Sequence, residues 1–194
     1  MNKIILASKS KIRQKILNEN GLICEVEPSR IDEEVVKKAL LKEGATPEII
    51  SKNLAELKAN KVSNKVPDEL VLGADSVIDL KGEIISKPNS RDEALKILNK
   101  LNGRSHFLIS SVCISKKGNM IWNYTDKAEL VMKSFKEDEL KDYLSKISDK
   151  NLYNYNVYQI EGEGKNLFSQ IKGDKNTIMG LPIDKIKDYL NRYK

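Results

Sequence analysis

Two carboxylates in this chain could hold a divalent cation. Asp75 interrupts an apolar run, residues 70–78, where a carboxylate is costly unless a metal or another cation pairs with it. Glu33 lies between Asp32 and Glu34 at the start of a predicted helix, where acidic residues also complement the helix dipole. An Asp75 that faces solvent at a bulge fits the sequence equally well, so both interpretations stay open at this point.

The first strand and helix predict an anion-binding turn. Residues 3–7 read as a strand, Ser8 and Ser10 follow, and a helix then runs to about Asn20. The unpaired N–H groups at a helix start, together with the helix dipole, favour a bound anion. Arg13, about one turn into the helix, could fork onto phosphate oxygens. Ordinary capping by a serine, beside a surface arginine, explains the same residues and is the commoner case.

Two lysines complete the set of charged candidates. Lys58 lies in a predicted helix that begins at Thr46-Pro47 and ends near Ser63, and Lys87 stands in a turn after a short strand. A surface lysine is the ordinary explanation for each of them. Taken together, two carboxylates, three cations and a helix-start anion site suit magnesium-assisted phosphoryl chemistry.

Other familiar active sites are disfavoured. The chain has one histidine, His106, in an alternating apolar run that predicts a strand histidine with one polar partner. Its two cysteines, Cys24 and Cys113, form no CxxC pair, which argues against a zinc finger. The P-loop, HExxH and GxSxG patterns do not occur.

The hydrophobic pattern predicts strands that alternate with helices. Strands are predicted at 3–7, 22–27, 69–79, 84–85, 105–115, 119–131, 155–160 and 166–171. Helices are predicted at 11–20, 32–41, 47–63, 91–101, 135–147 and 181–190. The two long strands flank a short hairpin connection, Lys116-Lys117-Gly118. This order predicts an α/β fold with a mixed sheet, and 194 residues suit one domain.

Composition narrows the class of protein further. The chain is 40% hydrophobic and 32% charged, which is typical of a globular protein. Its net charge is +6, but the lysines alternate with acidic residues and no arginine-rich stripe occurs, so we expect small anionic substrates and no specific nucleic acid. No apolar run approaches the ~20 residues that span a bilayer, and the start lacks a signal-peptide core, so we expect a cytoplasmic protein without a membrane partner.

An ordered series of short motifs resembles the Maf family of nucleoside triphosphate pyrophosphatases, also called septum-formation inhibitor or Maf-like proteins. No single motif is highly specific, but the series covers nearly the whole chain. In order it consists of Leu6-Ala7-Ser8-Lys9-Ser10 with Arg13, Asp32-Glu33, Leu54-Ala55 with Lys58-Ala59, Gly73-Ala74-Asp75-Ser76, Lys87-Pro88, Gly162, and Gly180-Leu181-Pro182.

The resemblance implies a metal-dependent hydrolase that splits a nucleoside triphosphate, including modified or noncanonical ones, into the monophosphate and pyrophosphate. It implies a Maf/inosine-triphosphatase-like mixed sheet flanked by helices, with a cleft between two lobes, over 1–194 as a single Maf-like domain that forms a homodimer. The divalent cation would be Mg²⁺, Mn²⁺ or Co²⁺. The roles carried over are the catalytic base at Asp75, metal binding by Glu33 and Asp75, and phosphate binding by Ser8, Ser10, Arg13, Lys58 and Lys87.

Three positions depart from the family's motifs and bear on base choice. Ile12 replaces an arginine tied to the branch that hydrolyses dTTP and UTP, and Ser76 replaces a threonine. Glu161 replaces a glutamine, and a carboxylate only accepts hydrogen bonds, which suits the donor edge of guanine or a methylated base. The 7-methyl-GTP branch, however, has an aromatic residue at position 12 and glutamine at 76. The sequence matches neither branch, so the preferred base stays open.

A different class of function is the main alternative. The chain could be a nucleotide-responsive regulator of cell division and septum formation that binds a partner with little or no turnover. Asp75 and Glu33 favour the enzyme, because a pure binder needs neither a base nor a metal carboxylate.

Overall fold

The computed structural model describes residues 4–193 and divides into two compact units. Unit 1 comprises Met1–Val77, Ile109–Lys127 and Asp174–Lys194, and unit 2 comprises Ile78–Leu108 and Ala128–Gly173. Both units draw on the three long strands of one sheet, and the chain passes between the units within β3, β5 and β6 and once more after β7.

The described residues form one seven-stranded sheet in the order β2-β1-β3-β5-β6-β7, with β4 paired to β3. β1 pairs in parallel with β2 and β3, whereas β4 pairs antiparallel to β3 and β7 antiparallel to β6. The strands are β1 Ile4–Leu6, β2 Cys24–Val26, β3 Leu70–Leu80, β4 Glu83–Ile85, β5 Ser105–Lys116, β6 Asn119–Met132 and β7 Phe168–Lys172. The prediction of an α/β fold with a mixed sheet is confirmed.

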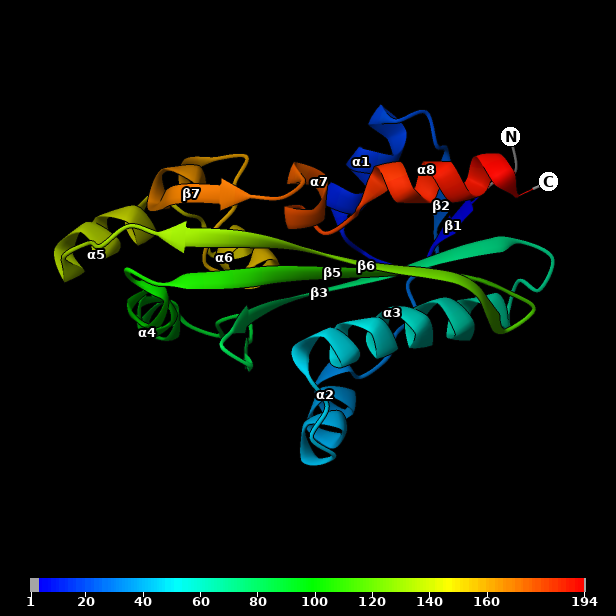
Figure 1. The fold of residues 1–194 in the computed structure, drawn as a ribbon, viewed down its shortest axis with the longest axis horizontal. Helices are drawn as coiled ribbons and strands as arrows, with labels where there is room; N and C mark the ends of the chain where they lie inside the picture. The colour runs from blue at the N-terminus through cyan, green and yellow to red at the C-terminus, as the bar shows by residue number, and fades with distance from the viewer. Residues whose placement is uncertain (1–3, 194) are drawn as a thin grey trace. The chain divides into compact units, whose positions relative to one another are not determined.

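Unit 1 packs helices on both faces of its strands (Figure 1). Side chains alternate along β1, so Ile4 and Leu6 join one core cluster and Ile5 and Ala7 the other. The first cluster includes residues of α1 (Lys11–Glu19) and α8 (Ile183–Arg192), and the second includes residues of α3 (Pro47–Ser63). The two faces therefore bring α1 and α3 to the same three strands, β1, β3 and β5, from opposite sides.

The contact between β3 and α3 depends on Gly73. A Cβ placed on Gly73 would lie 2.2 Å from the carbonyl oxygen of Ala55 and 2.9 Å from the Cβ of Ala59. Only glycine permits this approach, because the atoms in the way are mostly backbone. The close approach brings the residues that follow Gly73 on β3 next to the side chains of α3.

Unit 2 contains α4 (Arg91–Leu101), α5 (Glu137–Ser145), α6 (Asp149–Tyr155) and the 3-10 helix Glu163–Leu167. The predicted strand at 155–160 is wrong. Tyr155 ends α6, Asn156 has a φ of +75°, and the chain continues as a loop that buries Val157 and Tyr158. The alternation of large side chains there reflects burial of a loop and not a strand.

The remaining elements are close to their predicted positions. The hairpin strands agree to within one residue at each end, and Thr46 caps α3 with Pro47 in its first turn, as predicted. α2 (Glu33–Lys42) begins one residue later than expected, and two helices, α6 and α7 (Lys175–Ile178), were not predicted. Among the described residues, none of the helices combines the length and apolar character needed to cross a bilayer.

Candidate active site

Asp75 is buried in the middle of β3, with an exposed fraction of 4%. The strand predicted at 69–79 is confirmed and continues through Asp75 without a break, and the alternative of an aspartate that faces solvent is wrong. Its Oδ1 accepts a hydrogen bond from Lys58 Nζ at 2.8 Å. Its Oδ2 is buried and has no hydrogen-bond partner among the described residues. A buried carboxylate oxygen without a partner is costly, which marks this oxygen as the place where a ligand would contribute most.

Lys58 joins Asp75 to Glu33. It reaches β3 from α3 and is 5% exposed, so the expectation of a surface lysine is wrong. Its Nζ lies 2.8 Å from Asp75 Oδ1 and 2.9 Å from Glu33 Oε1. Glu33 is the first residue of α2, whose start is capped by Asp32, and its side chain is half-exposed. One ammonium group therefore holds together two carboxylates that lie 42 residues apart in the sequence.

The environment of Asp75 acts on its pKa in opposing directions. Burial has the largest effect and raises the pKa above the ordinary aspartate value. The charge and hydrogen bond of Lys58 lower it, Glu33 adds to the rise, and Arg13 contributes a smaller lowering. The net result is a raised pKa, so the proton affinity of this carboxylate exceeds that of a surface aspartate.

The turn between β1 and α1 has a serine cap, which both interpretations of the sequence predicted. Ser10 is the N-cap of α1, and its Oγ accepts from the backbone N–H of Arg13. Ser8 Oγ accepts from the Ser10 N–H at 3.2 Å and from Arg13 Nη1 at 3.2 Å. Since Ser8 Oγ accepts two hydrogen bonds, its O–H could donate to an anion at the helix start.

Most of the N–H groups of Arg13 donate hydrogen bonds to other groups of the protein. Nη1 donates to Ser8 Oγ and to the Ala74 carbonyl at 2.9 Å, Nη2 donates to Ser76 Oγ at 3.0 Å, and Nε donates to the Gly180 carbonyl at 2.9 Å. A guanidinium has five N–H donors, so these contacts occupy four of them. A two-pronged contact with phosphate, as expected from sequence, would require Arg13 to give up one of these bonds.

The residues around Asp75 suit a hard divalent cation. Mg²⁺ prefers oxygen ligands and is often held by one or two carboxylates together with substrate phosphates and water. Asp75 Oδ2 is an unpaired carboxylate oxygen, and Glu33 provides a second carboxylate on the same lysine. The described residues contain no cluster of three or more His, Cys, Asp or Glu side chains, so the chain offers a two-carboxylate site and not a complete protein cage.

The three remaining predicted site residues are Lys87, Glu161 and Ile12. Lys87 and Glu161 are exposed and belong to unit 2. Ile12 is partly buried and packs against the core cluster of α1 and α8. Glu161 does not line the small pocket of unit 2, but its chain neighbours Gln159 and Gly162 do. The structure thus connects Ser8, Ser10, Arg13, Glu33, Lys58, Asp75 and Ser76 by hydrogen bonds and ion pairs.

Sequence reasoning missed several supporting groups. Ser51, fully buried on α3, donates to the Asp75 carbonyl at 3.2 Å. Gly180 has a φ of +95°, and a Cβ on it would lie 3.1 Å from Ser76 Oγ and 3.3 Å from Arg13 Nε. A hydroxyl on an otherwise apolar helix face and a glycine before Leu-Pro were visible signals, but each is common without any functional role.

Comparison with known proteins identifies the family. A family model described as Maf-like protein matches residues 3–193. The chain belongs to the Maf-like protein family. The resemblance inferred from the ordered motifs is confirmed, since the match runs from the first strand to the last helix.

Named relatives fall into two kinds. A protein of Pelagibacter ubique named nucleoside triphosphate pyrophosphatase is 67% identical over 134 residues, which are 69% of each chain. A protein of Brucella abortus named 7-methyl-GTP pyrophosphatase is 37% identical over 131 residues, which are 68% of this chain and 66% of the relative. The aligned segments thus span about two thirds of each relative's length.

A solved structure shares the fold. The Ham1 protein of Staphylococcus aureus superposes with a TM-score of 0.53 at 16% sequence identity, and the match covers 100% of both chains. At this identity the likeness supports the α/β architecture alone. It agrees with the inosine-triphosphatase-like mixed sheet expected for the family.

Proposed function

We propose that this protein hydrolyses nucleoside triphosphates to the monophosphate and pyrophosphate, with modified or noncanonical nucleotides as its targets. The coarser statement, an enzyme of the class of hydrolases acting on acid anhydrides, is confirmed by its family and by the names of its relatives. The observation that carries the proposal is the unpaired Asp75 Oδ2 beside a buried lysine and a second carboxylate.

In this proposal Asp75 is the general base. A base must accept a proton near the reacting atom, and a carboxylate with a raised pKa is a stronger acceptor than a surface carboxylate. Lys58 bonds to Oδ1 of Asp75 and compensates the negative charge of the carboxylate. Oδ2 is therefore the oxygen that remains available to water. Ser51 fixes the main chain at this residue through the Asp75 carbonyl. The proton of the attacking water would move to Oδ2 as oxygen bonds to the α-phosphorus and pyrophosphate leaves.

The phosphates would be bound by the turn before α1 and by lysines. The Ser8 and Ser10 hydroxyls and the first N–H groups of α1 form the anion site, and Arg13 stands behind Ser8 as a fixed positive charge. Lys58 and Lys87 would add charge along the triphosphate. A divalent cation, Mg²⁺, Mn²⁺ or Co²⁺, held by Asp75 and Glu33, would offset phosphate charge and polarise the phosphoryl group.

Base choice would depend on Ile12, Ser76 and Glu161. The relatives include nucleoside triphosphate and 7-methyl-GTP pyrophosphatases, and the three positions match neither branch throughout. Glu161 is exposed beside the small pocket of unit 2, where an acceptor could meet the donor edge of a purine. The homodimer, the single Maf-like domain over 1–194 and the cytoplasmic location remain predictions of the family resemblance.

A panel of nucleoside triphosphates tests the proposal. Each would be incubated with the protein and Mg²⁺ or Mn²⁺, and the products separated by anion-exchange chromatography. We expect monophosphate and pyrophosphate in equal amounts from at least one substrate. Diphosphate and orthophosphate would contradict attack at the α-phosphorus, and binding without turnover across the panel would favour the regulator.

A further inference from the structure

Ser110 is a fully buried hydroxyl in β5 that the proposed mechanism does not use. Its Oγ lies 2.8 Å from Ser76 Oγ and 2.7 Å from the main-chain carbonyl of Thr177. A carbonyl only accepts, so Ser110 must donate its one hydrogen to Thr177. Ser76 must then donate to Ser110, and this leaves Ser76 Oγ to accept from Arg13 Nη2, as it does at 3.0 Å.

These bonds close into a ring. The Thr177 carbonyl also accepts from the Gly180 N–H at 3.0 Å, and the Gly180 carbonyl accepts from Arg13 Nε at 2.9 Å. The hydrogen bonds therefore run from Arg13 through Ser76, Ser110, Thr177 and Gly180 back to Arg13. Each hydroxyl in the ring has a determined direction, so no member can rotate without breaking a bond. Hydrogen bonds that are linked through hydroxyls, each of which accepts one bond and donates another, strengthen one another.

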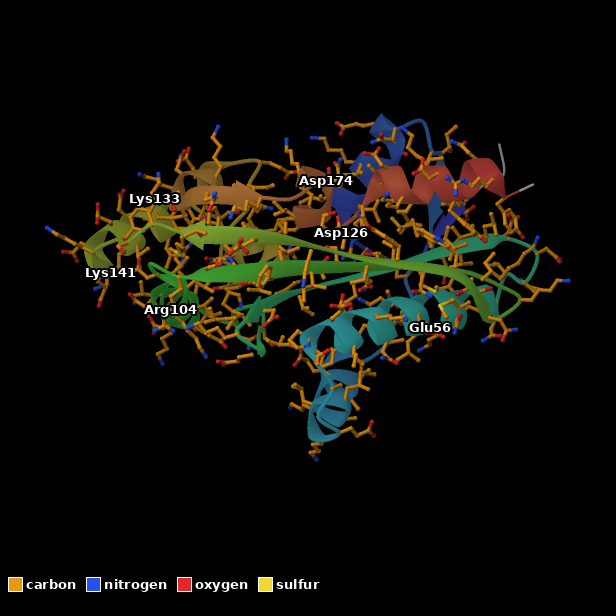
Figure 2. All side chains as sticks on the ribbon, viewed as in Figure 1. Glu56, Arg104, Asp126, Lys133, Lys141 and Asp174 are labelled. Atoms are coloured by element: carbon orange, nitrogen blue, oxygen red, sulfur yellow. The ribbon has the colours of Figure 1, made fainter. Side chains whose placement is uncertain are left out.

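Other contacts fix the ring to the fold. Thr177 Oγ1 donates to Asp126 at 2.7 Å, and its backbone N–H donates to the side chain of Asp174 at 2.7 Å. Both aspartates are labelled in Figure 2, beside α7 and the neighbouring part of β6. Gly180 itself leaves no room for a side chain, because a Cβ would lie 3.1 Å from Ser76 Oγ and 3.3 Å from Arg13 Nε.

The ring holds the residues on both sides of Asp75. Arg13 Nη1 binds the carbonyl of Ala74, the residue before Asp75, and Arg13 Nη2 binds the side chain of Ser76, the residue after it. We propose that Ser110 is a positioning residue, which holds Ser76 and through it Arg13, and so fixes the place of the Asp75 carboxylate. This inference rests on the proposed role of Asp75 as the base. A small displacement of a reacting group can cost a large factor in rate, so a buried serine in the next strand can affect turnover without touching substrate.

The neighbouring serine provides a matched control. Ser111 is 1% exposed, lies next to Ser110 in β5, and bonds to Thr125 Oγ1 at 2.9 Å, outside the ring. We expect Ser110→Ala to lower kcat about tenfold with little change in KM, and Ser111→Ala to leave kcat unchanged. Both variants lose one buried hydroxyl, so a purely structural role would lower their unfolding temperatures and their rates alike.

A double variant tests whether the serines act as one unit. Ser76→Ala should lower kcat about as much as Ser110→Ala, and the double variant should be no slower than either, because residues of one network are not additive. Effects that multiply in the double variant, or equal rates for Ser110→Ala and Ser111→Ala, would overturn the proposal.

A measurement without substrate separates this inference from the proposed function. In nitrogen-15 NMR the Arg13 Nε–H, assigned with Arg13→Lys, should exchange slowly with water in the wild type and in Ser111→Ala, and faster in Ser110→Ala. Equal exchange in all three would overturn the ring whatever the activity. A wild type that releases no pyrophosphate would refute the proposed function instead, while the exchange data still decide whether Ser110 holds Arg13.

Discussion

Among the described residues, each compact unit buries one titratable side chain that has a polar atom without a hydrogen-bond partner. The surroundings of these two side chains differ. In unit 1, Asp75 Oδ2 has no partner among the described residues, and in unit 2 the same holds for His106 Nδ1. Burial shifts both groups toward their neutral forms, raising the pKa of Asp75 and lowering that of His106 to about 4. Only Asp75 has cations beside it, Lys58 in contact and Arg13 farther away, that oppose the shift.

The surroundings of His106 are aromatic. Its Nε2 lies 2.9 Å from the Tyr158 hydroxyl, and its ring contacts the rings of Tyr158 and Phe168. The prediction of a strand histidine with one polar partner is confirmed. The two buried groups thus differ in their neighbours: Lys58 stabilises the charged form of Asp75, whereas burial among aromatic rings keeps His106 neutral.

Replacing Lys58 should change the free energy of unfolding most, because it removes the cation that distinguishes Asp75 from His106. Lys58→Met leaves Asp75 buried without its cation, and removing one partner of a buried ion pair typically costs about 3–5 kcal/mol. Urea unfolding at neutral pH should show this loss. Protonation of Asp75 removes the unpaired charge, so the loss should shrink as the pH falls.

The matched control is Lys52→Met, which removes an exposed lysine from the same helix. We expect its free energy of unfolding to stay within about 0.5 kcal/mol of the wild type. Equal stability of the two variants would show that Lys58 does not compensate a charged Asp75.

His106 should also make the free energy of unfolding depend on pH. Its effect should be smaller than that of Lys58→Met, and it should destabilise the fold as the pH falls. Its pKa falls from 6.5 in the unfolded chain to about 4 in the folded one, so between these values the unfolded state binds more protons. The stability should therefore fall as the pH drops from 6.5 to about 4, by on the order of 3 kcal/mol.

The measurement is urea unfolding at several pH values for the wild type and for His106→Gln. The variant keeps a side chain able to bond to Tyr158 but removes the titration, so its stability should vary less across this window. Identical pH slopes for the two proteins would contradict a neutral, buried His106.

The smallest expected effect concerns base choice in unit 2. Glu161→Gln should change the ratio of kcat/KM between GTP or 7-methyl-GTP and UTP by roughly tenfold, because a site built around one donor or acceptor discriminates against the other. Asp92→Asn removes an exposed carboxylate from the first turn of α4, also in unit 2 but not among the residues that line the pocket, so it is the control and should keep the wild-type ranking. An unchanged ranking in Glu161→Gln would refute the role of this residue.

Much of the fold followed from local signals. The hairpin of β5 and β6 and the capped start of α3 were predicted closely, since turn and cap chemistry depend on neighbouring residues. The segment 155–160 was misread because buried loop residues can alternate like a strand. Asn156, in a left-handed conformation, is the residue that ends α6 there.

The sequence indicated which residues to consider for the candidate site, but not which contacts they make. The family motifs pointed to Asp75, Lys58 and Glu33, yet the local pattern around Lys58 is that of any helix surface. Its burial depends on Gly73, which lets β3 approach α3 so closely that a lysine from the helix faces the strand. Arg13, which joins α1 to β3, likewise bonds to Gly180, 167 positions away in the sequence.

The most direct test of the account compares two aspartates on β3. Asp75→Asn keeps an oxygen for Lys58 but removes the base, and Asp79→Asn changes a partly exposed aspartate whose Oδ1 accepts from the Gly82 N–H. With the best triphosphate of the panel and Mg²⁺, we predict that Asp75→Asn lowers pyrophosphate release by roughly 10²–10⁴-fold while the fold stays intact, as a cooperative urea transition would show. Asp79→Asn should stay near the wild-type rate. Near-normal pyrophosphate release by a folded Asp75→Asn would contradict the central claim.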